Sequence, residues 1–111
     1  MERLNDYRKI IKTFLEESIV GELDDPNFET QLICDRERDH YQLVSLGWQG
    51  HRRFYSVLIH IDIKEGKIWI QRNDTDRLIA QELMALGVAR EDIILGLQPA
   101  YARADTGYSV A

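Results

Sequence analysis

Features that define several other protein classes are missing from this sequence. Cys34 is its only cysteine, which excludes a disulfide within the chain and is typical of a reducing compartment. No apolar run reaches the roughly 20 residues that a bilayer-spanning helix needs. The first ten residues mix acids and bases without an apolar core, so we expect no export signal. These absences predict a cytoplasmic protein with no membrane contact.

Motifs for catalysis and nucleotide binding are missing as well. The chain contains no G-x-S-x-G, P-loop or G-x-G-x-x-G pattern, which leaves hydrolase and nucleotide-binding functions without support. The spacing of His40, His51 and His60 matches no metal-ligand pattern. Cys34 lies in a predicted strand, where a small buried apolar role is more typical than a nucleophilic one. We therefore expect no cofactor and no metal.

Charge is distributed unevenly along the 111 residues. The chain has 14 Lys and Arg against 19 Asp and Glu, a net charge of −5, which disfavours nucleic-acid binding driven by charge alone. Residues 21–40 carry seven acids and two bases, whereas residues 41–72 carry five bases and two acids. The basic middle segment either neutralises its acidic neighbours or offers a face to an acidic partner. With 44% hydrophobic residues, the composition predicts one globular domain over 1–111.

The hydrophobic period predicts a helix followed by strands. Residues 2–20 form an amphipathic helix that ends at Gly21, and a turn-rich connector follows it. From Phe28 onward the period changes to two, which predicts strands joined by short turns. The expected strands cover 30–35, 40–48, 52–64 and 67–73, with turns at 35–39, Gln49-Gly50 and Glu65-Gly66. The 35–39 turn, DRERD, lacks the glycine and final glutamate of a calcium-binding loop and predicts a solvated hairpin tip.

Pairing across the Glu65-Gly66 turn separates two kinds of side chain. Ile61 then faces Ile70 and His60 faces Gln71. One face of this hairpin is wholly apolar and consists of Ile59, Ile61, Ile63, Ile68 and Ile70. The other face carries His60, Asp62, Trp69 and Gln71. The apolar face needs a cover, and the N-terminal helix is the obvious candidate.

A second helix is predicted after the last of these strands. Asp74 or Thr75 can cap its start, and Gly87 is a suitable stop. Its expected buried stripe is Ile79, Ala80, Leu83 and Leu86. Residues 89–97 predict a turn with a short strand that ends before Pro99. The fold class is therefore α+β: an antiparallel β-meander of about four to five strands, covered on one face by the N-terminal helix and the second helix.

Candidate functional residues lie on the polar strand face, in a basic run and in the tail. The polar face is either an interaction surface or the place of a His60–Asp62 acid/base pair. A partner-binding surface would combine Trp69, Gln71, His60, Asp62, Tyr101 and Tyr108. The run of His51, Arg52 and Arg53 either contacts an anion or pairs with the acidic 21–40 segment.

Three blocks of sequence carry a resemblance to a known family. They are HYQLVSLGW, LIHIDIKEGKIWIQ and the joint ELMALGV followed by REDI. With them the chain resembles the XisI family, the fdxN-element excision controlling factors, from LNDYRKIIKTFLEE to the final SVA. The resemblance implies a small α+β protein of cyanobacterial type. It also implies a companion protein, XisH, and a separate site-specific recombinase, and it assigns no catalytic residues.

Three functions follow as hypotheses. In the first, the protein is a non-enzymatic accessory factor for excision of a DNA element and binds an XisH-type companion. In the second it contacts DNA directly through the basic segment 41–72, and in the third it is a small enzyme that uses His60 and Asp62. The sequence is also compatible with a homo-oligomer, because a meander leaves edge strands that a second copy could cover.

Overall fold

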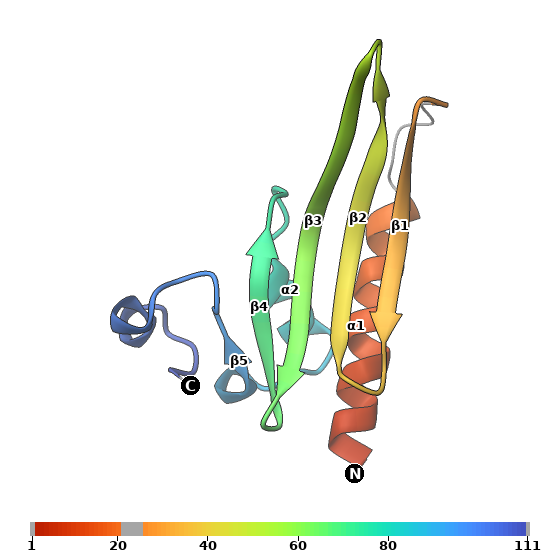
Figure 1. Cartoon of the computed structure of the whole chain (residues 1–111). Coiled ribbons are helices and arrows are strands. Elements are labelled where there is room, and N and C mark those ends of the chain that lie inside the picture. Colours follow the sequence, from red (N-terminus) through yellow and green to blue (C-terminus); the bar gives the residue numbers. More distant parts are fainter. Residues whose placement is uncertain (1, 21–25, 111) are drawn as a thin grey trace.

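A computed structural model describes residues 2–20 and 26–110. Its five strands form one sheet in the order in which they occur along the chain: β1 (Phe28–Asp35), β2 (His40–Gln49), β3 (Arg52–Lys64), β4 (Lys67–Asn73) and β5 (Ile93–Ile94). The first four strands are antiparallel neighbours, and β5 pairs with β4 in parallel. Helices α1 (Glu2–Val20) and α2 (Ile79–Ala85) lie behind one face of this sheet (Figure 1). The predicted α+β meander is confirmed, and its fifth strand is parallel rather than antiparallel.

The core lies between α1, α2 and the helix-covered face of the sheet. The apolar stripe of α1 is buried there through Tyr7, Ile11, Phe14 and Leu15. The isoleucines of β3 and β4 that the sequence places on one face are all buried against it. Of the stripe expected on the second helix, Ile79 and Leu83 are buried, Ala80 is half-buried and Leu86 is exposed. Among the described residues, no helix is both long enough and apolar enough to cross a membrane.

Two tight turns set the strand register. Glu65 and Gly66 both have positive φ, 53° and 78°, as a two-residue turn that matches the sheet twist requires. They connect Lys64 to Lys67, as predicted. The turn between β2 and β3 consists of Gly50 and His51, one residue later than expected, because Gln49 still pairs with Arg52.

The second helix begins later than the sequence suggests. The expectation that Asp74 or Thr75 caps it is wrong, since α2 starts at Ile79. The Asn73 side chain holds the intervening loop: its oxygen accepts from the Thr75 backbone, and its nitrogen donates to the Arg77 carbonyl. These local bonds compete with helical ones and keep residues 74–77 out of the helix. The predicted stop at Gly87 is correct, with a φ of 116°. The predicted stop of the first helix at Gly21 lies outside the described residues.

The turn between β1 and β2 is anchored to α1. The expected solvated tip is wrong for Asp39, whose carboxylate accepts from Arg8 Nε at 2.8 Å and from the Tyr41 hydroxyl at 2.8 Å. The Arg8 hydrogen bond lowers the pKa of Asp39 more than burial raises it. Asp35 also serves the turn, by accepting from the backbone of Glu37 and Arg38. This end of the sheet is therefore tied down by charged groups.

The opposite end of the sheet extends as a hairpin arm, residues 48–55 of β2 and β3. The pairing of β3 with β4 begins only at Ile59, so this part of β3 has β2 as its neighbour. Figure 1 shows the arm reaching past the end of β4. Trp48, Phe54 and Tyr55 are exposed on it.

Candidate functional site

A polar cluster lies on the sheet face opposite the helices. His60 and Asp62 are two residues apart in β3, and His60 Nε2 lies 2.7 Å from Asp62 Oδ1, as the sequence predicts for one strand face. His40, directly opposite Asp62 on β2, places its Nδ1 2.8 Å from the same oxygen. Gln42 is paired with His60, and its Nε2 lies 3.2 Å from His60 Nδ1. The structure thus assembles two imidazoles around one carboxylate.

Asp62 is the centre of this cluster. Only 8% of the residue is exposed, yet its carboxylate is well satisfied, because Gln71 Nε2 donates to the second oxygen, Oδ2, at 3.2 Å. Burial alone would raise the pKa of Asp62, but the hydrogen bonds from His40, His60 and Gln71 outweigh it and lower the pKa. Asp62 is therefore an ionised carboxylate at neutral pH.

The tautomers of the two histidines follow from their partners. An ionised carboxylate can only accept, so His60 donates from Nε2 and His40 donates from Nδ1. In the neutral imidazole, His60 Nδ1 then accepts from the Gln42 amide. The His40 side chain is 53% exposed and the His60 side chain 28% exposed, so solvent reaches the cluster from the His40 side.

Sequence reasoning missed His40 and Gln42 as members of this site. The pairing around the Gly50–His51 turn, continued without interruption, would place His40 opposite Ile61 and turn it to the wrong face. A register shift between Leu43 and Val44 inserts one extra residue in β3 and brings His40 opposite Asp62. A second shift next to His60 pairs it with Arg72 instead of the predicted Gln71. The only sign of this bulge in the sequence is that the apolar residues Leu43 and Val44 are adjacent, which breaks the strand alternation.

Trp69 and Gln71 join the same face but are partly covered. Lys64 Nζ lies 4.4 Å from the centre of the Trp69 ring, and the Arg103 guanidinium carbon lies 5.2 Å from it. A Cβ at Gly96 would lie 2.4 Å from Gln71 Oε1 and 3.1 Å from the Trp69 ring. The C-terminal segment therefore packs closely on both side chains. Trp69 is half-buried, and its ring is held in place by these contacts.

The two tail tyrosines do not share one environment. Tyr101 lies in the short helix η2 (Ala100–Asp105) and is 87% exposed. Tyr108 packs against the core, and the Arg90 guanidinium lies 5.1 Å from its ring centre. Tyr101 is thus available to a partner, whereas most of Tyr108 serves the fold.

The predicted basic run lies at the end of the hairpin arm. His51 is in the turn, and Arg52 and Arg53 open β3. Their guanidinium groups lie over aromatic rings, Arg52 over Phe54 at 5.4 Å and Arg53 over Trp48 at 5.3 Å. Stacking of this kind leaves the guanidinium edges open to an anion. The three histidines whose spacing matches no metal-ligand pattern are not brought together, because His51 lies at the far end of the ladder from His40 and His60.

Cys34 corrects another expectation. It is exposed rather than buried, because β1 is an edge strand and Cys34 pairs with Tyr41 at the end nearest the turn. Periodicity alone places a residue on a face, but it does not show whether a helix covers that part of the face.

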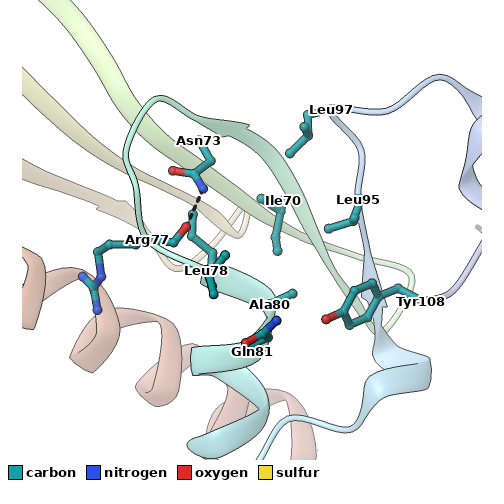
Figure 2. Close-up of a pocket in the computed structure, with 10 residues that line it drawn as sticks. Ile70, Asn73, Arg77, Leu78, Ala80, Gln81, Leu95, Leu97 and Tyr108 are labelled. Carbon is teal, nitrogen blue, oxygen red and sulfur yellow. Dashed lines mark hydrogen bonds between the residues drawn. The ribbon is translucent and has the colours of Figure 1, made fainter. Parts of the chain in front are cut away.

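An open cleft of about 320 Å³ lies between β4, α2 and the C-terminal segment. Figure 2 shows the side chains of Ile70, Leu95, Leu97 and Tyr108 around it, with the Asn73–Arg77 hydrogen bond at its rim. Neither His60 nor Asp62 lines this cleft. The polar cluster is therefore a feature of the sheet surface, separate from this cleft.

Comparisons with known proteins agree with the fold. The profile described as "XisI protein" matches residues 1–110. A XisI-like protein from Anabaena variabilis ATCC 29413 is 50% identical, with a TM-score of 0.92 over 97% of this chain and 99% of its own. The fdxN element excision controlling factor XisI from the same organism is 31% identical, with a TM-score of 0.84 over 98% of this chain and 99% of its own. A search among curated proteins gives no significant match.

Proposed function

The chain belongs to the XisI family, and from this premise we propose that it is a non-enzymatic controlling factor for excision of a DNA element. It would act in the cytoplasm by binding a companion protein of the XisH type. The name of the 31% identical relative, an fdxN element excision controlling factor, supports the process. The molecular role is our own inference from the surface.

The observation that carries this proposal is the sheet face opposite the helices. Helices cover one face of the sheet (Figure 1). The other face presents the polar cluster beside Trp69, whose ring contacts Lys64 and Arg103. Tyr101 lies two residues before Arg103 in the C-terminal segment, and its side chain is almost fully exposed. Supported aromatic residues next to polar groups are typical of binding hot spots. We name Trp69, Gln71, His60, Asp62 and Tyr101 the docking face.

Co-purification with the XisH-type companion from the same genome tests the proposal. We expect a complex at micromolar concentration, and Tyr101→Ala should weaken it by more than about tenfold, the loss typical of a hot-spot tyrosine. Tyr55→Ala is the matched control, since Tyr55 is an exposed tyrosine on the hairpin arm. Absence of a complex would contradict the proposal. A loss with Tyr55→Ala alone would move the docking surface to the arm.

DNA contact is the second candidate, and the hairpin arm favours it. The arm presents Arg52 and Arg53 at its end, away from the anchored turn at Asp39. Two arginines neutralise about two phosphates, so the binding constant should depend only weakly on salt, with a log–log slope near −2. A gel-shift assay with the borders of the element at low salt, repeated with Arg52→Ala and Arg53→Ala together, distinguishes this function from companion binding. The acidic net charge of −5 is why we rank it second.

Catalysis by His60 and Asp62 has less support than either. Both histidine contacts of Asp62 are directed at one oxygen on a sheet surface, and the cleft in Figure 2 contains neither residue. A catalytic pair usually works in an enclosed site that excludes water. The cluster nevertheless has a chemistry of its own.

A further inference from the structure

Three ligand-bearing side chains converge on one point of the sheet surface. His40, His60 and Asp62 each offer one ligand atom, and these three atoms lie within 4.8 Å of one another. Each nitrogen is within 2.8 Å of the carboxylate oxygen. They come from two neighbouring strands in fixed register, so the backbone holds their Cβ atoms in place.

We propose that His40, His60 and Asp62 form a binding site for a divalent transition-metal ion such as Zn²⁺ or Co²⁺. Two imidazoles and one carboxylate are a ligand set of the kind that these ions select, whereas Mg²⁺ and Ca²⁺ prefer oxygen ligands alone. Three protein ligands leave at least one position open, and the half-exposed His40 places that position toward solvent. The site shares His60 and Asp62 with the docking face, but metal binding by the isolated protein does not depend on the companion.

The ligand atoms need only small displacements to accept an ion. Metal–nitrogen and metal–oxygen bonds of about 2.0–2.2 Å separate tetrahedral ligand atoms by roughly 3.3 Å. The present separations from Asp62 Oδ1, 2.8 and 2.7 Å, are about half an ångström shorter than that. The ion binds His40 Nδ1 and His60 Nε2 in place of their protons. Each ring stays neutral, because its proton moves to the other ring nitrogen. No oxidation or covalent bond to carbon is involved.

Two glutamines can hydrogen-bond to the metal ligands and orient them. Gln71 Nε2 holds Asp62 Oδ2 and so turns Oδ1 toward the imidazoles. Gln42 lies beside His60 Nδ1, and rotation of its amide would present the oxygen to the proton that the ion displaces there. Lys64, the cation that follows Asp62 on this face, lies instead over the Trp69 ring. These placements orient the ligands without adding a competing one.

Titration of the tag-free protein with Zn²⁺ in a calorimeter tests the proposal. We expect one ion per chain with a dissociation constant below about 10 μM, weakening as the pH falls because protons compete for the imidazole nitrogens. His40→Gln should reduce the affinity by more than about tenfold. His51→Gln is the matched control, since His51 is an exposed histidine in the distant turn. It should bind as the wild type does.

A second measurement guards against loss of folding. Tetrahedral Co²⁺ gives visible absorption bands far more intense than those of octahedral aqueous Co²⁺, and these intense bands should appear in the wild type and be lost in His40→Gln. Saturating Zn²⁺ should raise the melting temperature of the wild type and of His51→Gln, but not of His40→Gln. The proposal is overturned if no binding appears up to about 1 mM, or if His40→Gln binds as tightly as the wild type. Equal losses in His40→Gln and His51→Gln would also overturn it, because they indicate unspecific binding to surface histidines.

Discussion

Ile61 and Asp62 are neighbours in β3, and their side chains point to opposite faces of the sheet. Ile61 is fully buried among the isoleucines beneath α1 and α2. Asp62 is almost as buried, but its surroundings are two histidines and a glutamine. Ile61 is held by removal of apolar area from water, whereas Asp62 is held by hydrogen bonds to its ionised carboxylate. One strand can therefore serve both the core and a polar surface.

The largest loss of stability is expected from a cavity on the helix-covered face. Ile61→Ala should lower the free energy of unfolding by about 3–4 kcal/mol, since it removes a fully buried side chain from a packed core. Urea denaturation measures the loss. His60→Ala, at the adjacent position on the other face, is the control and should cost clearly less. Equal costs for the two variants would mean that both faces are held in the same way.

Asp62→Asn should have an intermediate effect of about 2 kcal/mol at neutral pH, because it removes the charge that three side chains share. The pKa of Asp62 is lowered in the folded protein, so its contribution to stability is complete above the unfolded pKa of about 3.9. The contribution is lost as the pH falls through the lower folded pKa. Denaturation midpoints of the wild type and Asp62→Asn should therefore converge below about pH 4. A constant difference across this range would contradict the assigned ionisation.

The smallest of these effects lies at the rim of the core. Tyr41→Phe removes the hydroxyl that donates to Asp39 and keeps the buried ring, so it should cost about 1 kcal/mol. Thermal unfolding at neutral pH measures it. Tyr55→Phe on the hairpin arm, where the residue is exposed, is the matched control and should cost almost nothing. A loss of stability as large as that of Ile61→Ala would mean that the Tyr41–Asp39 hydrogen bond stabilises the fold as much as a buried core side chain does.

Much of the fold was predictable because local patterns and tertiary packing agree. The stripe of α1 and the alternation in β3 and β4 each name one apolar face, and the two faces bury each other. The start of α2 was not predictable from its capping residues, because Asn73 organises the preceding loop through its own side chain. The exposure of Cys34 depended on where the helix cover ends.

The candidate site was only half predictable. His60 and Asp62 share a face by their spacing alone, and so do Trp69 and Gln71 within the same hairpin. His40 and Gln42 come from β2. A single extra residue in β3 decides whether they pair with Asp62 and His60 or with the residues on either side of them.

Local sequence patterns are enough to predict the first helix, the strands and an apolar face that has to be covered, because hydrophobic period and turn residues act over short distances. Which polar groups meet across β2 and β3 depends on the strand register of the folded sheet. The tertiary structure also decided that the C-terminal segment covers Trp69, and that Tyr101 remains exposed while Tyr108 packs against the core. Register shifts and close packing depend on all strands at once, and no single stretch of sequence contains that information.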